Sequence, residues 1–63
     1  MTNLKRMRTK TGITQATLSK ITGVKLRSLQ NYEQGQDNIN QAAAITVLRL
    51  ARALGCSVED ILE

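Results

Sequence analysis

The chain has 63 residues, of which 41% are hydrophobic and 22% are charged, a balance typical of small globular proteins. This length allows one domain, spanning residues 1–63, and excludes a second. The sequence has no histidine and a single cysteine, Cys56, so it lacks the residues for a Ser-His-Asp or Cys-His catalytic group, a Cys and His zinc site or an internal disulfide. We therefore expect no enzymatic activity, no metal and no cofactor, and we expect Cys56 to pack as a small apolar residue rather than act as a reactive thiol.

The basic residues are concentrated in the first half of the sequence. Residues 1–32 contain seven Lys and Arg and no acid, whereas residues 33–63 contain two Arg and five Asp and Glu, so the halves carry net charges of +7 and −3. This asymmetry favours a protein that binds a polyanion, although charge alone fits a solvated basic surface equally well.

Three features of the sequence favour a cytoplasmic protein with no membrane partner. No apolar run approaches the ~20 residues that a membrane span needs. No charged leader precedes a short apolar stretch. A lone cysteine favours a reducing compartment.

The first two predicted helices are short and are separated by glycine. Leu4 and Met7 lie three residues apart in a first helix that ends at Gly12. Thr14 is the expected N-cap of a second helix over residues 15–22. The residues predicted for the apolar face of this second helix are Leu18 and Ile21.

A third helix is predicted over residues 25–34, ending at Gly35. With Leu29 as the centre of the inward face, a rotation of 100° per residue places Tyr32 and Glu33 on the same side. The opposite side is a polar stripe without an acid, which offers several hydrogen-bond donors and acceptors in a row. The residues of this stripe are Arg27, Gln30, Asn31 and Gln34.

The second half predicts two more helices. One runs from Gln41 to Leu54 and ends at Gly55, and Ser57 with Asp60 has the capping-box spacing of a last short helix. The residues predicted to be buried on these two helices are Ala44, Val47, Leu48, Ala51, Leu54, Val58, Ile61 and Leu62. The whole pattern predicts an all-α fold, a compact bundle of five short helices.

Residues 15–34 satisfy the packing demands of two helices that cross through a tight turn. Leu18 and Leu29 are placed to face each other, and the small side chain of Ser19 lets the helices approach. Gly23 suits the turn and Val24 fills the corner. This pattern predicts a helix-turn-helix, whose second helix lies in the major groove of DNA in known complexes.

The residues in and around this window follow a characteristic order. They are Leu4, Met7 and Arg8, then Ile13 to Gln15 with Leu18 and Ser19, then Gly23, Val24, Leu29, Tyr32, Glu33 and Gly35, and finally Leu50, Ala51, Leu54, Gly55, Val58 and Leu62. With this order, nearly the whole chain resembles the Cro and phage-repressor family of helix-turn-helix domains, also called XRE-like. The resemblance implies a lambda-repressor-like fold that binds double-stranded DNA.

The resemblance also implies which residues contact DNA. The position of Gln15 meets a phosphate and braces the recognition helix in this family, and the positions of Leu26, Arg27 and Asn31 reach base edges. Leu26 fits a second interpretation, as the edge of the core, equally well. The other candidate DNA-binding residues are Thr14 beside Gln15, Gln30 and Gln34 on the stripe, Lys25 before the recognition helix, and Gln36 and Asn38 in the loop after it.

The family further implies an ion pair between the first and third helices, at the positions of Arg8 and Glu33. Glu33 is the only acid before Asp37 and lies on the inward face of its helix, where an unpaired carboxylate would be costly to bury. We expect this pair to be structural and not to contact DNA.

The sequence departs from the family pattern at three places. Lys25 occupies an N-cap position that Ser, Thr or Asp would fill better. Ile21 and Thr22 are exchanged relative to the usual polar-then-apolar order, which leaves Ile21 partly exposed. The loop over residues 36–40 lacks Lys and Arg, so its phosphate contacts would come from Asn and Gln side chains.

Two classes of function remain open from the sequence. The first is a small transcriptional repressor that binds a pseudo-palindromic DNA operator, as a monomer or weak homodimer whose pairing DNA promotes, with no small-molecule ligand. The second is a protein-interaction module on the same fold, such as an antitoxin-type or polymerase-binding partner. The residues that would form its surface on the last two helices are Ile45, Leu50, Ile61 and Leu62, although ordinary core packing fits each of them better.

Overall fold

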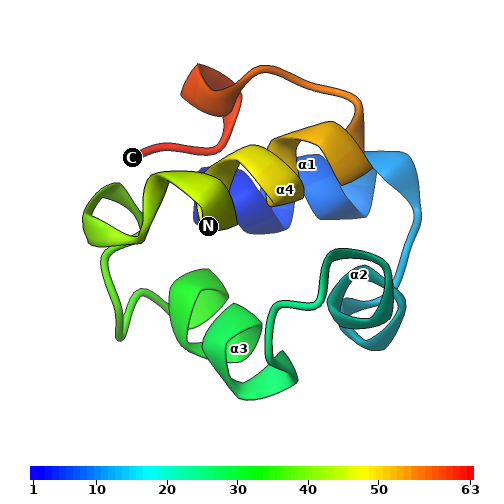
Figure 1. The fold of residues 1–63 in the computed structure, drawn as a ribbon, viewed down its shortest axis with the longest axis horizontal. Helices are drawn as coiled ribbons and strands as arrows, with labels where there is room; N and C mark the ends of the chain where they lie inside the picture. Colours follow the sequence, from blue (N-terminus) through cyan, green and yellow to red (C-terminus); the bar gives the residue numbers. More distant parts are fainter.

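The computed structural model describes residues 1–63 and contains four α-helices, two single-turn 3-10 helices and no strand. In Figure 1, α1 and α4 run through the middle of the molecule, with α2 and α3 on one side and the C-terminal segment on the other. The elements in chain order are α1 (Asn3–Thr11), α2 (Gln15–Thr22), α3 (Leu26–Gln34), η1 (Ile39–Gln41), α4 (Ala44–Leu54) and η2 (Val58–Asp60).

Local capping signals explain where the first two helices begin and where all four α-helices end. The Thr14 hydroxyl accepts a hydrogen bond from the Thr17 N–H at 3.1 Å, as expected for an N-cap. Thr2 caps α1 in the same way through the Lys5 N–H, at 3.3 Å. Every α-helix ends at a glycine with positive φ, which places the chain in the left-handed region that glycine adopts without strain.

The prediction of five helices is wrong, because the fifth does not form as an α-helix. The fourth helix also starts later than predicted. The Asn38 carboxamide accepts the Asn40 N–H at 2.9 Å and closes the 3-10 turn η1. Ala42 then has an extended backbone, with φ −70° and ψ 156°, so α4 begins at Ala44 rather than Gln41. Ala44 itself is exposed and not part of the buried face.

The last predicted helix is the 3-10 turn η2. Its capping box is present, with the Ser57 N–H donating to Asp60 at 3.0 Å. The residue after the turn, Ile61, is completely buried in the core.

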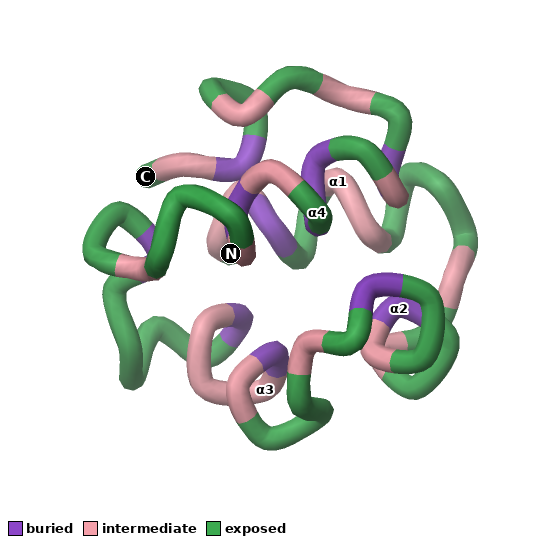
Figure 2. The backbone as a smooth tube through the Cα atoms, in the orientation of Figure 1, coloured by how far each residue is buried: buried purple, intermediate pink, exposed green.

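The core is aliphatic and occupies the space between the helices. Buried residues lie on the inward sides of the elements, coloured purple in Figure 2. Complete burial of a leucine or isoleucine stabilises a fold by about 1.5–3 kcal/mol, so a few such side chains contribute much of the stability of a domain of this size. The side chains without exposed surface are Leu4, Leu18, Leu29, Leu50 and Ile61, and those nearly buried are Ile39, Val47, Ala51 and Leu54.

The burial of Leu50 and Ile61 removes both from any surface that binds a partner. Of the residues that the sequence suggested for such a surface, Ile45 is exposed and Leu62 is half-buried. The interpretation of Leu50 and Ile61 as core residues is the correct one.

The exchange of Ile21 and Thr22 places a threonine at a core position of α2. Ile21 is 62% exposed and Thr22 only 7%, so the assignment of Ile21 to the apolar face is wrong and the expected exposure of its side chain is right. The Thr22 hydroxyl donates to the Leu18 carbonyl at 2.7 Å and accepts the Val24 N–H at 3.2 Å. Because both hydrogen-bonding functions are satisfied, the threonine is buried without an unpaired polar group.

Hydrogen bonds from Asn3 and Asn40 hold the end of the chain against the rest of the protein. The Asn40 carboxamide accepts the Glu63 N–H at 2.8 Å and donates to the Glu63 carbonyl at 3.2 Å. The Glu63 carboxylate accepts the Asn3 N–H at 2.7 Å at the start of α1, where the helix has no acid of its own. This contact supplies the negative charge that a helix N-terminus favours.

Cys56 is half-buried and packs against the core, as the sequence predicted. Burial, the larger cause, and the negative charge of Asp60, the smaller one, raise the pKa of its thiol above the ordinary value. The thiol therefore stays protonated near neutral pH, which opposes a role as a nucleophile.

None of the helices combines the length and the hydropathy that a bilayer-spanning segment requires.

Replacing Gly23 tests whether backbone conformation controls the turn between α2 and α3. Gly23→Ala should lower the free energy of unfolding by about 1–2 kcal/mol, because a Cβ is disfavoured in the left-handed region. No other atom lies within 4 Å of an added Cβ, so sterics outside the backbone contribute nothing. Gly23→Asn is the matched control and should lose less, since asparagine tolerates this region better. Urea unfolding measures both, and equal losses would contradict the explanation.

Candidate nucleic-acid interface

The turn between α2 and α3 is built from a few polar and apolar contacts. The Ser19 hydroxyl donates to the Val24 carbonyl at 2.6 Å, which ties the end of α2 to the turn. Leu18 and Leu29 are both completely buried on the inward sides of the two helices, and α2 packs against α3. Val24 is half-buried against the same core. These positions are those that the sequence pattern assigned to a helix-turn-helix.

The outward side of α3 is polar and its side chains make no hydrogen bond within the protein. Leu29 and Glu33 are buried and Tyr32 is half-buried, so this side of the helix is fixed against the core. On the other side, Arg27 and Gln34 are exposed and Gln30 and Asn31 are partly exposed. Their donors and acceptors are therefore free to bind another molecule.

Lys25 and Leu26 lie at the start of α3. Lys25 is exposed and makes no side-chain capping bond, so its ammonium group is also free. Leu26 is 39% exposed, so more than a third of its side chain is open to solvent beside the polar stripe. It contributes less to the core than Leu29, and its apolar surface is available for contact.

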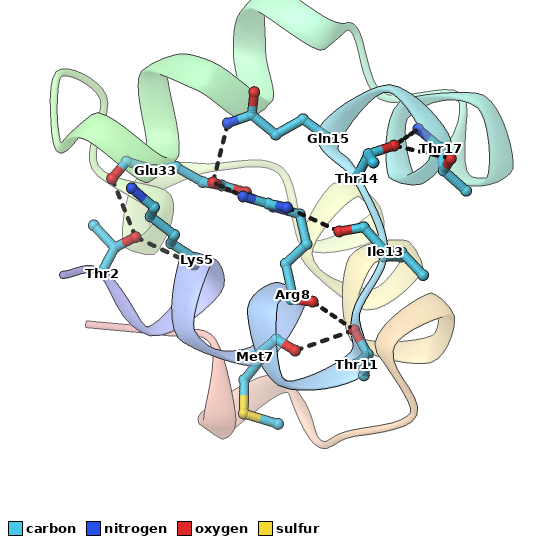
Figure 3. A network of polar contacts seen from close by, with 10 residues as sticks. All are labelled: Thr2, Lys5, Met7, Arg8, Thr11, Ile13, Thr14, Gln15, Thr17 and Glu33. Carbon is cyan, nitrogen blue, oxygen red and sulfur yellow. Dashed lines mark hydrogen bonds and ion pairs between the residues drawn. The ribbon is translucent and has the colours of Figure 1, made fainter.

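Glu33 connects three parts of the chain through its buried carboxylate. Arg8 Nε donates to Glu33 Oε2 at 2.7 Å and Arg8 Nη2 donates to Oε1 at 3.0 Å, a two-bond ion pair between α1 and α3 (Figure 3). Arg8 Nη1 also donates to the Ile13 carbonyl at 2.8 Å, in the segment before α2. The Glu33 side chain is only 2% exposed, so its charge is almost fully removed from water. The ion pair thus lies at the two positions named from the sequence.

Gln15 adds a third donor to the same carboxylate. Its Nε2 donates to Glu33 Oε1 at 3.0 Å, so the first residue of α2 is linked directly to α3 (Figure 3). Gln15 is partly exposed at the N-terminal end of its helix. A molecule bound there would contact a residue that also fixes the position of α3.

The ion pair keeps the polar side of α3 free of negative charge. The hydrogen bond to Glu33 raises the pKa of the Arg8 guanidinium above its ordinary value, burial acts in the opposite direction, and the Glu33 charge adds to the increase. Arg8 is therefore always charged and neutralises the only acid of α3. The next acid along the chain is Asp37, which is exposed in the loop after the helix.

The remaining candidate residues from the sequence lie at the surface in different states. Thr14 is exposed, but its hydroxyl accepts the Thr17 N–H and donates to the Thr17 hydroxyl at 2.9 Å, so capping already occupies it. Gln36 and Asn38 are exposed in the loop after α3, and the Asn38 oxygen is used to cap η1. Among these residues, only Gln36 has a fully free side-chain amide.

Two contacts of the network were not predicted. Thr2 donates to the backbone carbonyl of Glu33 at 3.3 Å, and the Ile13 carbonyl accepts from Arg8. Both acceptors are backbone oxygens, whose positions carry no residue-type signal in the sequence.

The comparison with known families agrees with this geometry. A model described as helix-turn-helix matches residues 4–61, from α1 to the residue after η2. The chain therefore belongs to the XRE and Cro/C1-type helix-turn-helix family of DNA-binding regulators. Neither a search of curated proteins nor a search of solved structures gives a match.

Removing one partner of the buried ion pair should strongly destabilise the protein. Glu33→Gln and Arg8→Met should each lower the free energy of unfolding by about 3–5 kcal/mol, because the remaining buried group loses its counter-charge. The double variant should lose less than the sum of the two. Urea unfolding followed by circular dichroism measures these losses.

Arg6→Met is the matched control, because Arg6 lies on the same helix, is exposed and bonds only to Asn3. Its loss should stay within about 0.5 kcal/mol. If Glu33→Gln were no more destabilising than Arg6→Met, the ion pair would not stabilise the fold.

Proposed function

We propose that this protein is a small transcriptional repressor that binds specific double-stranded DNA sequences by placing α3 in the major groove. The observation that carries the proposal is the acid-free, unbonded polar side of α3, held outward by the Arg8–Glu33 pair. Membership of the helix-turn-helix family supports DNA binding in general. A helix in the major groove meets a distinct pattern of donors and acceptors at each base pair.

Each residue on the polar side of α3 has a base-edge partner that suits its chemistry. The Arg27 guanidinium can donate two hydrogen bonds to guanine O6 and N7, and the Asn31 amide can pair with adenine N6 and N7. Gln30 and Gln34 carry the same amide group at neighbouring positions of the helix. The exposed part of Leu26 suits a thymine methyl group.

Phosphate contacts would surround this helix and fix its orientation. The N-terminal end of α2, at Thr14 and Gln15, has the helix-dipole polarity that favours an anion. Lys25 adds a free cation at the start of α3, and Gln36 and Asn38 are exposed just after its end. Because Gln15 also bonds Glu33, a phosphate held there would be coupled to the position of α3.

Binding as two copies on a pseudo-palindromic operator fits this class of protein. With 63 residues the protein has little surface for stable self-association, so we propose a monomer or weak homodimer whose pairing DNA promotes. Such a regulator would be non-enzymatic and would act in the cytoplasm. The alternative function as a protein-interaction module would use Ile45 and Leu62, since the other two residues suggested for its surface, Leu50 and Ile61, are buried.

Arg27 should determine base preference. The parent protein is first used to select bound duplexes from a random pool, which defines the preferred sequence. Arg27→Ala should then reduce discrimination by about 1–3 kcal/mol at one base-pair position and leave the other positions unchanged. Competition binding with single-substituted duplexes measures this effect. Unchanged affinity and preference in the variant would contradict the assignment of α3 to the major groove.

Lys25 should contribute affinity without sequence preference. Lys25→Ala should weaken binding to preferred and random duplexes by the same factor, and it should reduce the slope of log affinity against log salt by about 0.9. Titrations over a range of salt concentrations measure the slope. Lys10→Ala, another exposed lysine, is the control and should leave the slope unchanged. A loss confined to the preferred sequence would assign Lys25 to base readout instead.

A further inference from the structure

A shallow groove lies between α2 and α4, separate from the polar side of α3. Its volume is about 510 Å³, and it combines exposed apolar surface with two positive charges. No acid lines it. The lining residues are Ile21, Thr22, Arg49, Arg52 and Ala53.

The apolar surface of the groove comes from Ile21 and Ala53. Ile21 exposes 62% of its surface, so most of this aliphatic side chain is open to solvent. Thr22 turns its hydroxyl to the Leu18 carbonyl, so this group is not available to a ligand.

The two arginines of the groove are unpaired. Both are exposed, and the only ion pair of the protein is the one between Arg8 and Glu33. They are also the only basic residues after residue 33, and all other charged residues in that half of the chain are Asp or Glu. The dipole of α4 favours a cation at Arg52 in the last turn, but not at Arg49 in the middle of the helix.

The arginines lie on one side of α4 with a further exposed apolar residue. At 100° per residue, Ile45, Arg49 and Arg52 fall within about 60° of one another around the helix. Ile45 is 53% exposed, so the same side of α4 offers apolar and cationic surface in adjacent turns. Arg49 and Arg52 are spaced i, i+3, which sets their Cβ atoms about 5–6 Å apart.

We propose that this groove binds an acidic polypeptide segment that also carries aliphatic side chains, on a protein partner. An aliphatic side chain of the partner would cover Ile21, and its carboxylates would pair with the guanidinium groups of Arg49 and Arg52. A DNA phosphate would satisfy the arginines but would leave Ile21 exposed, so the combination favours a polypeptide.

The groove also opens in a different direction from the DNA-facing residues. Around α2, Gln15 and Ile21 lie about 120° apart at 100° per residue. Gln15 bonds Glu33 of α3, whereas Ile21 faces the groove with α4. A partner in the groove and a duplex on α3 therefore bind to different sides of α2.

The test is an amide NMR titration of the full chain with three synthetic helical peptides. The first carries Glu and Leu at i, i+3 and i+4 spacings, the second replaces each Glu with Lys, and the third replaces each Leu with Ser. We expect the first peptide to shift the amide signals of the groove residues, and the other two to bind at least about tenfold more weakly. Equal binding of the Lys peptide, or shifts centred on α3, would overturn the proposal.

Two variants separate this site from DNA binding. The double variant Arg49→Gln with Arg52→Gln should weaken the Glu and Leu peptide about tenfold and leave the affinity for DNA and its salt slope unchanged. Arg27→Gln is the matched control, since it removes an exposed arginine from α3 and should leave the peptide affinity unchanged. If the double variant instead reduced the DNA salt slope by about 0.9 for each arginine, the arginines would hold phosphates and the proposal would fail.

Discussion

The structure depends on one buried carboxylate. Glu33 accepts hydrogen bonds from Arg8 in α1 and from Gln15 at the start of α2, while it belongs to α3 itself. A carboxylate removed from water in this way is tolerated only with such partners, because the cost of dehydration must be offset by good geometry. The three consecutive helices α1, α2 and α3 are therefore held in one arrangement. The rotation of α3 about its axis, and with it the direction of its polar side, follows from this arrangement.

The same contact has an electrostatic effect. Glu33 is the only acid in the first 33 residues, and its pairing with Arg8 leaves the other bases of that half uncompensated. The positive potential at the surface therefore comes from the exposed Lys and Arg side chains, whereas the carboxylate of Glu33 lies in the interior. Along the chain, the next acid after Glu33 is Asp37 in the loop after α3, and the only acid that the fold brings to the start of α1 is Glu63.

The parts of the fold that could be predicted from the sequence are those with local causes. Thr14 caps α2 through a residue three positions away, and glycines end the α-helices through their own backbone conformation. The turn η1 also has a local cap, since the Asn38 carboxamide accepts the Asn40 N–H, but no pattern in the sequence indicated that the Asn40 side chain bonds the backbone of Glu63, 23 residues further along the chain. Ile21 was misplaced because its neighbour Thr22 satisfies its own hydroxyl locally and so occupies the core position.

For the candidate site, helical periodicity was sufficient to predict which side of α3 faces outward. It did not show which donors are already used within the protein, since the Thr14 hydroxyl and the Asn38 oxygen are occupied by capping and the Arg27 guanidinium is free. The bond between Gln15 and Glu33 joins residues 18 positions apart, and only the family resemblance suggested that Gln15 supports α3.

The scarcity of aromatic residues gives the protein a spectroscopic property. Tyr32 is the only aromatic residue of the chain, and it is half-buried on α3, next to Glu33. All intrinsic fluorescence therefore originates from a single phenol on this helix, without tryptophan emission to mask it. Changes in emission intensity would report on the surroundings of α3 alone, with no label attached to the protein.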